Sequence, residues 1–157
     1  MRAPPEMLYE VITNTIYLDN AINEVISMYF GAYNIKEDEK DSNTSTLEPL
    51  EKFHRFFLQE LGANSKLKLI KEIGETCYRK IELPKGFEEK FRRFYIIRNI
   101  FAHNLYPKHV DGKELPNNMP NDANWEELHK EHKGVFDELN NFIIKKLYTQ
   151  VFEDCFM

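Results

Sequence analysis

Residues 87–105 read FEEKFRRFYIIRNIFAHNL, and their apolar side chains recur every three or four positions, as in an amphipathic helix. Pro84 cannot continue a preceding helix, so we expect this one to run from about Gly86 to Asn104. At about 100° per residue, one arc of the helix collects most of its apolar side chains: Phe87, Phe91, Phe94, Tyr95, Ile97, Phe101, Ala102 and Leu105. The stretch therefore predicts a helix that packs its aromatic face into a bundle.

Two polar features of this helix lie at defined positions around its axis. Arg98 falls near the centre of the apolar arc, so we expect it to point into the bundle. Asn99 and His103, one turn apart, share the other side of the helix. A buried arginine needs a counter-charge, because an unpaired ion is costly to bury.

The rest of the chain contains four more stretches with helical periodicity. The first is expected over Glu6 to Phe30, with Gly31 as its stop, and the second over Glu48 to Leu61. The third is expected to begin at Asn64 or Ser65 and to continue to Pro84. The last should start near Asn124, whose spacing to Glu127 is typical of a helix cap. These stretches predict an all-α, single-domain bundle of about five helices over residues 1–157.

Two connections separate these helices. Residues 34–46 include the polar run KEDEKDSNTST, and residues 105–122 contain three prolines and the turn signal Asp111-Gly112. The second connection is long for a compact domain, which is typical of a functional or partner-facing loop.

Composition narrows the class of protein. No apolar run approaches the roughly 20 residues needed to cross a bilayer, and no signal peptide is apparent, so we expect a soluble, cytoplasmic protein. The net charge of −5 argues against a general nucleic-acid coat, although eight lysines and arginines against four acids between Lys80 and Lys113 make the region around residues 87–105 basic. Cys77 and Cys155 have no neighbouring ligands and are expected to be reduced thiols.

A metal site receives little support from the sequence. Glu126, His129 and His132 share one side of the last helix and could act as ligands, but no second motif of this kind accompanies them. We therefore predict a solvated polar turn, with His132 near the inner face, and neither a metal nor another cofactor.

The helix expected over residues 6–30 carries a carboxylate on its apolar arc, and this carboxylate could pair with Arg98. Asp19 lies near the middle of the apolar arc of residues 6–30. If this helix packs beside residues 86–104, Asp19 and Arg98 are each other's most plausible partners, and loss of either one should cost a few kcal/mol. The pattern predicts a structural Asp19–Arg98 ion pair, which leaves open whether Arg98 also binds phosphate.

The run Arg98-Asn-Ile-Phe-Ala-His103 resembles the Rx4-6H motif of the HEPN superfamily. The surrounding FRRFYIIRNIFAHN and the stretch YLDNAI, residues 17–22, are also similar to mannitol-operon-repressor-like members. Residues 36–46 and 107–122 have no counterpart in this resemblance.

The resemblance implies metal-independent RNA cleavage, in which a ribose 2′-hydroxyl attacks the adjacent phosphate. His103 would be the general acid/base, Arg98 the phosphate clamp and Asn99 an orienting group; Arg92, Arg93 and Lys108 would be further RNA contacts. On one regular helix, Arg98 and His103 diverge by about 140°, so a homodimer is expected to complete the groove.

Two functions remain open from the sequence. One is an endoribonuclease of the toxin or phage-defence type, with an antitoxin or nucleotidyltransferase as partner. The other is a non-catalytic HEPN module, a regulator or interaction subunit in which Arg98 is an internal strut.

Overall fold

The computed structural model describes residues 3–38, 58, 61–103, 109–110, 113–114 and 124–156. Within these ranges the protein is an all-α bundle, as predicted, accompanied by two strands of two residues each. Most of the helix expected over residues 48–61 lies outside the described residues, although Leu58 is buried in the core. No helix in the described ranges combines the length and apolar character needed to span a membrane.

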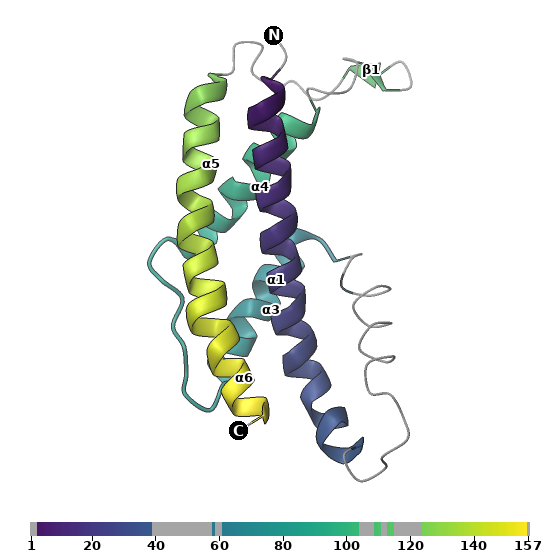
Figure 1. The fold of residues 1–157 in the computed structure, drawn as a ribbon, viewed down its shortest axis with the longest axis vertical. Coiled ribbons are helices and arrows are strands. Elements are labelled where there is room, and N and C mark those ends of the chain that lie inside the picture. Colours follow the sequence, from purple (N-terminus) through teal and green to yellow (C-terminus); the bar gives the residue numbers. More distant parts are fainter. Residues whose placement is uncertain are drawn as a thin grey trace.

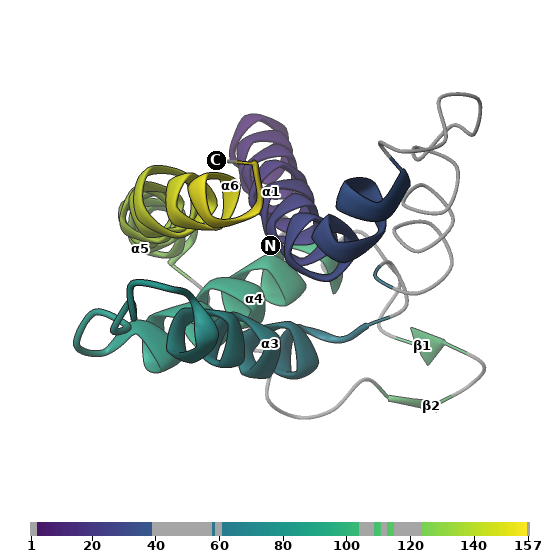
Figure 2. The ribbon, with the colours of Figure 1, turned by 90° about the horizontal axis from the view of Figure 1, so that it is seen from below.

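The bundle has two layers of helices. In front, α1 (Pro5–Asp38) runs beside a long rod made of α5 (Trp125–Asn140), a π-helical segment (Asn141–Tyr148) and α6 (Thr149–Phe156) (Figure 1). Behind them lie α3 (Ala63–Thr76) and α4 (Phe87–His103) (Figure 2). This arrangement places α4 against both rods of the front layer.

The two front rods are parallel and in register. Thr15 meets His132 across the interface, and the rings of Tyr17 and Phe136 lie with their centroids 6.0 Å apart. From the first contact to the second, the residue number increases in both helices. The helices α1 and α5 therefore run in the same direction (Figure 1).

Helix α4 forms as the sequence predicts. Gly86 adopts a φ of +75°, a conformation that favours glycine, directly before the first helical residue. The aromatic face is buried as expected: Phe87, Phe91, Phe94, Ile97 and Phe101. Its upper end packs on the last rod, where the rings of Phe101 and Trp125 are 5.0 Å apart.

The bounds of the first helix depart from prediction. Helix α1 continues past Gly31 to Asp38, because one glycine costs only about 1 kcal/mol in a helix interior and does not by itself end a long helix.

The third helix is shorter than predicted. Helix α3 starts after Gly62 and ends at Thr76, well before Pro84. Its end is fixed by the chain folding back, since the Ile81 amide donates to the Gly74 carbonyl over 2.9 Å.

The last helix begins where it was predicted to begin, but its winding changes along its length. Asn124 caps it, its Oδ1 accepting from the Glu127 amide at 3.2 Å, which confirms the predicted start. Residues 141–148 wind as a π-helix, which the periodicity did not indicate. Every fourth side chain is buried in and around this segment: Leu139, Ile143, Leu147 and Val151. On a regular α-helix, side chains four positions apart differ by about 40° in direction, and on the wider turns of a π-helix they differ by less.

The connection before α5 contains a short hairpin. Strand β1 (His109–Val110) pairs antiparallel with β2 (Lys113–Glu114), with Val110 opposite Lys113. The predicted turn signal Asp111-Gly112 lies outside the described residues.

Candidate functional site

A polar groove opens between α1, the start of α3 and the second half of α4. Its volume is about 400 Å³. The described residues that line it come from these three segments: Ile12, Thr15, Ile16, Asp19, Asn20, Leu61, Ala63, Lys66, Tyr95, Arg98 and Asn99. The structure thus brings Arg98, Asn99 and Asp19, three of the predicted site residues, to one depression in the surface.

Arg98 does not point into the bundle, contrary to the prediction. Its side chain is exposed, and its Nη1 donates to Oδ1 of the neighbouring Asn99 over 2.8 Å. Helix α3 runs antiparallel to α4, with Lys71 paired to Glu88 near the start of α4. Among the described residues, α3 begins only at Ala63, and Arg98 lines the groove beside the start of this helix.

The predicted Asp19–Arg98 ion pair is also wrong. Asp19 instead accepts from the Lys66 ammonium at 2.8 Å and from the Tyr95 hydroxyl at 3.0 Å, both on Oδ1. The Lys66 side chain is only 3% exposed, whereas that of Asp19 is 34% exposed. The buried cation that Asp19 neutralises is therefore a lysine of α3.

The sequence contains a signal for the burial of Lys66 that the predictions from the sequence did not include. Lys66 lies four and seven positions before Ile70 and Ile73, on the apolar stripe of α3. A lysine in that phase calls for a buried carboxylate, and Asp19 is the carboxylate in the matching position on α1.

Burial keeps the hydroxyl of Tyr95, the second donor to Asp19, in its protonated form. Removal from water, and secondly the negative charge of Asp19, raise the pKa of the Tyr95 hydroxyl well above its ordinary value. The hydroxyl therefore stays protonated and remains a donor to Asp19. Lys66, Asp19 and Tyr95 form a hydrogen-bonded polar floor beneath Arg98.

The other arginines of α4 differ from Arg98 in their partners. Arg93 grips Glu131 of α5 with two bonds, Nε to Oε1 at 2.7 Å and Nη2 to Oε2 at 3.1 Å. Arg92 lies 3.6 Å from a Glu88 oxygen. Both are thus partly neutralised by carboxylates, while the predicted RNA contact Lys108 lies outside the described residues.

His103 is separate from the groove within one chain. It is exposed and is the last residue of α4, and it is not among the described residues that line the groove. On the same helix, Ile96 is 49% exposed and Ile100 is half-buried. The single chain presents the guanidinium and the imidazole on different sides of α4.

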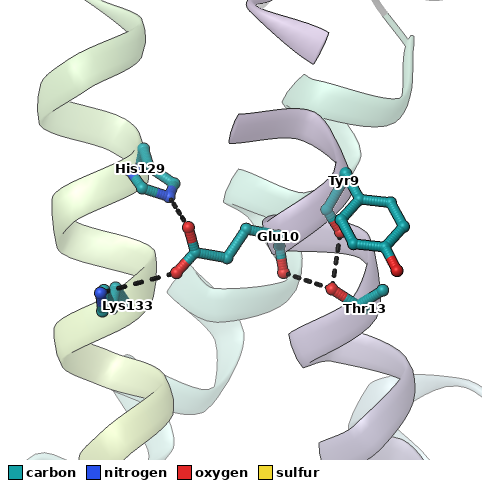
Figure 3. A network of polar contacts seen from close by, with 5 residues as sticks. All are labelled: Tyr9, Glu10, Thr13, His129 and Lys133. Carbon is teal, nitrogen blue, oxygen red and sulfur yellow. Dashed lines mark hydrogen bonds and ion pairs between the residues drawn. The ribbon is translucent and has the colours of Figure 1, made fainter. Parts of the chain in front are cut away.

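His129 of α5 belongs to the contact with α1 (Figure 3). The Glu10 carboxylate lies 2.8 Å from His129 Nε2 and 3.6 Å from the Lys133 ammonium. The hydrogen bond with His129 is the main reason that the pKa of Glu10 is lowered. Glu10 thus joins the two front rods through a partly exposed polar contact.

His132 is an interior residue, as its predicted inner position suggested. Its Nε2 lies 3.1 Å from the Thr15 hydroxyl, and its ring stacks on Phe94 with centroids 4.2 Å apart. Burial, and secondly the nearby His129, lower the pKa of His132 to about 4. In the described part of the chain, no three histidine, cysteine, aspartate or glutamate side chains are grouped so as to hold a metal ion.

Comparison with known proteins gives no relative: no protein-family model, curated protein or solved structure matches this chain.

Proposed function

We propose that this chain is a cytoplasmic, HEPN-type endoribonuclease that cleaves RNA without a metal ion. The proposed reaction is attack of a ribose 2′-hydroxyl on the adjacent phosphorus, which breaks the bond to the 5′-oxygen. Arg98 binds the phosphate, Asn99 orients Arg98, and His103 moves the proton. The products are a 2′,3′-cyclic phosphate and a 5′-hydroxyl end.

The observation that carries this proposal is the state of Arg98. Its guanidinium is exposed, borders a groove and is held by an amide oxygen, which does not neutralise its charge. Among the described ion pairs, none joins Arg98 to a carboxylate, whereas Arg92 and Arg93 are each paired to one. A guanidinium without a carboxylate partner among the described residues has both the charge and the fork geometry to bind a phosphate bidentately.

A two-fold homodimer completes the proposed site. Since Arg98 and His103 face different sides of α4, the imidazole that serves one guanidinium comes from the second protomer. Apposed α4 helices also cover Ile96, which is 49% exposed. That imidazole accepts the 2′-hydroxyl proton and then protonates the leaving 5′-oxygen, so one histidine serves both steps in each groove.

The test is cleavage of a labelled, structured RNA in the presence of EDTA. We expect the wild-type protein to release fragments ending in a 2′,3′-cyclic phosphate, and His103→Ala and Arg98→Ala each to lose at least about 100-fold in rate. Arg79→Ala, which removes an exposed arginine that is not among the described residues lining the groove, is the matched control and should cleave normally. Inert wild-type protein, or full activity of His103→Ala, would contradict the proposal.

A non-catalytic HEPN module is the second candidate, favoured by the separation of His103 from the groove within one chain. Such a regulator or interaction subunit would bind RNA or a partner protein through the Arg98 groove and leave the RNA intact. In the sequence analysis, this function was linked to an Arg98 that is buried as an internal strut. That link does not hold, because Arg98 is exposed. RNA binding that depends on Arg98 without any cleavage would favour this function.

The proposed nuclease activity also implies a partner protein. A toxin- or defence-type ribonuclease needs an inhibitor, so we propose an antitoxin or a nucleotidyltransferase as its partner.

A further inference from the structure

The floor of the groove holds a buried cation with unused donors. Lys66 is 3% exposed and lines the groove, and its only described acceptor is Asp19 Oδ1. An ammonium has three donors, so two hydrogens of Lys66 have no acceptor among the described residues. A buried lysine in this state is suited to an anionic ligand at the groove floor.

The charges of the groove leave a surplus of one positive charge. Lys66 and Arg98 are two cations, and Asp19 is the one acidic side chain among the described lining residues. A single phosphodiester carries one negative charge, which matches this surplus. Within the described residues, Arg98 donates through Nη1 to Asn99, and its other guanidinium donors can face the same phosphate.

Part of the α1 wall of the groove is apolar. Ile12 and Ile16 of α1 line it, and Ile16 is 54% exposed although it is aliphatic. Asp19 Oδ2 receives no hydrogen bond from the described residues and can accept from a hydroxyl or an amino group. A volume of about 400 Å³ lies within the range of small-molecule sites, which start at about 300 Å³.

We propose that this groove binds one nucleotide unit, with its phosphate between Arg98 and Lys66 and its ring against Ile12 and Ile16. The inference builds on the proposed RNA substrate and adds Lys66 as a second phosphate contact. Asp19 and Tyr95 are positioning residues, because their hydrogen bonds hold the Lys66 ammonium at the floor.

Direct titration with adenosine 5′-monophosphate, adenosine and inorganic phosphate tests the proposal by calorimetry. We expect the nucleotide to bind at least about ten times more tightly than either part alone, because the groove has separate places for charge and ring. Arg98→Ala should weaken nucleotide binding at least about tenfold, and Arg79→Ala should leave it unchanged. Equal affinity for inorganic phosphate, or no nucleotide binding, would overturn the proposal.

Lys66 needs a variant that keeps the protein folded. In the double variant Asp19→Asn/Lys66→Met the buried pair is removed together, so no charge is left unpaired, and far-UV circular dichroism checks the fold. We expect at least about tenfold weaker nucleotide binding by the double variant. If the double variant is folded and its affinity for the nucleotide is unchanged, Lys66 is not part of the site.

The two proposals can fail separately. If nucleotide binding depends on Arg98 and Lys66 but RNA stays intact, the nucleotide site stands and catalysis falls. If RNA is cleaved in a His103-dependent manner while the double variant binds nucleotide normally, the nuclease proposal stands and the role of Lys66 falls.

Discussion

At the scale of single residues, the charged side chains of the groove have divided roles. Lys66 and Asp19 form the buried pair that we expected of Arg98 and Asp19, while Arg98 stays in solvent. Lys66 contributes to stability and, by our proposal, to ligand binding, whereas Arg98 is assigned to ligand binding alone, so mutagenesis can separate the two effects.

The first prediction concerns this division. Lys66→Ala should lower the free energy of unfolding by about 2 kcal/mol, since it leaves Asp19 without its cation; the partial exposure of Asp19 keeps the loss below that of a fully buried pair. Arg98→Ala should change it by less than about 0.5 kcal/mol. Urea unfolding measures both, with the exposed Lys68→Ala as control, and equal losses for Lys66 and Arg98 would contradict the assignment.

The second prediction concerns His132 and pH. Its folded pKa of about 4 lies below the usual value of about 6.5, so the folded state favours the neutral ring. This contribution to stability is fully present above pH 6.5 and is lost as the pH falls from 6.5 towards 4, by up to about 3 kcal/mol.

Urea unfolding of wild type and His132→Gln at several pH values measures this effect. The groups facing His132 are Thr15, His129, Glu10 and the Phe94 ring, and the carboxylate of Glu10 titrates in both proteins. The difference between the two curves should therefore isolate His132. Parallel curves between pH 7 and 5 would show that its ring does not control acid stability.

At the scale of elements, local patterns predicted helix starts better than helix ends. The aromatic stripe and Gly86 fixed α4, and Asn124 fixed the start of α5, because each signal lies within one turn of the structure it specifies. The end of α3 depends instead on the chain returning to Gly74, a contact between elements that periodicity cannot contain.

The site was only partly predictable for the same reason. Arg98, Asn99 and Asp19 were found from spacing and phase, and they do line one groove. The direction of Arg98 was wrong because helical phase gives an angle around one axis but not where a neighbouring helix begins. Lys66 was missed although its phase on α3 was visible.

The third prediction compares two helical glycines. A Cβ at Gly74 would lie 2.8 Å from the Ile81 carbonyl oxygen, whereas a Cβ at Gly134 in α5 meets nothing within 4 Å. Gly74→Ala should therefore destabilise by about 1–3 kcal/mol, and Gly134→Ala should stabilise by up to about 1 kcal/mol because alanine is the better helix former. Thermal melting checks both, and a neutral Gly74→Ala would mean that residues 77–84 do not pack on α3 as described.

At the scale of the whole molecule, the separation of Arg98 and His103 makes assembly part of the proposed activity. The fourth prediction is that Ile96→Lys yields a monomer by size-exclusion chromatography with light scattering and loses RNA cleavage, yet still binds adenosine 5′-monophosphate in its own groove. Tyr9→Lys, at another exposed apolar position, is the control and should remain dimeric and active. A dimeric, active Ile96→Lys would place the interface elsewhere.

The fifth prediction follows from a site shared between protomers. Arg98→Ala and His103→Ala should each be inactive alone, but a mixed dimer has one site with both an intact guanidinium and an intact imidazole. Equal mixing makes about half of the dimers mixed, each with one working site of two, so activity should recover to about a quarter of wild type. No recovery after verified subunit exchange would mean that each groove draws its arginine and histidine from the same chain, and the separation of these side chains on α4 would then argue for binding without cleavage.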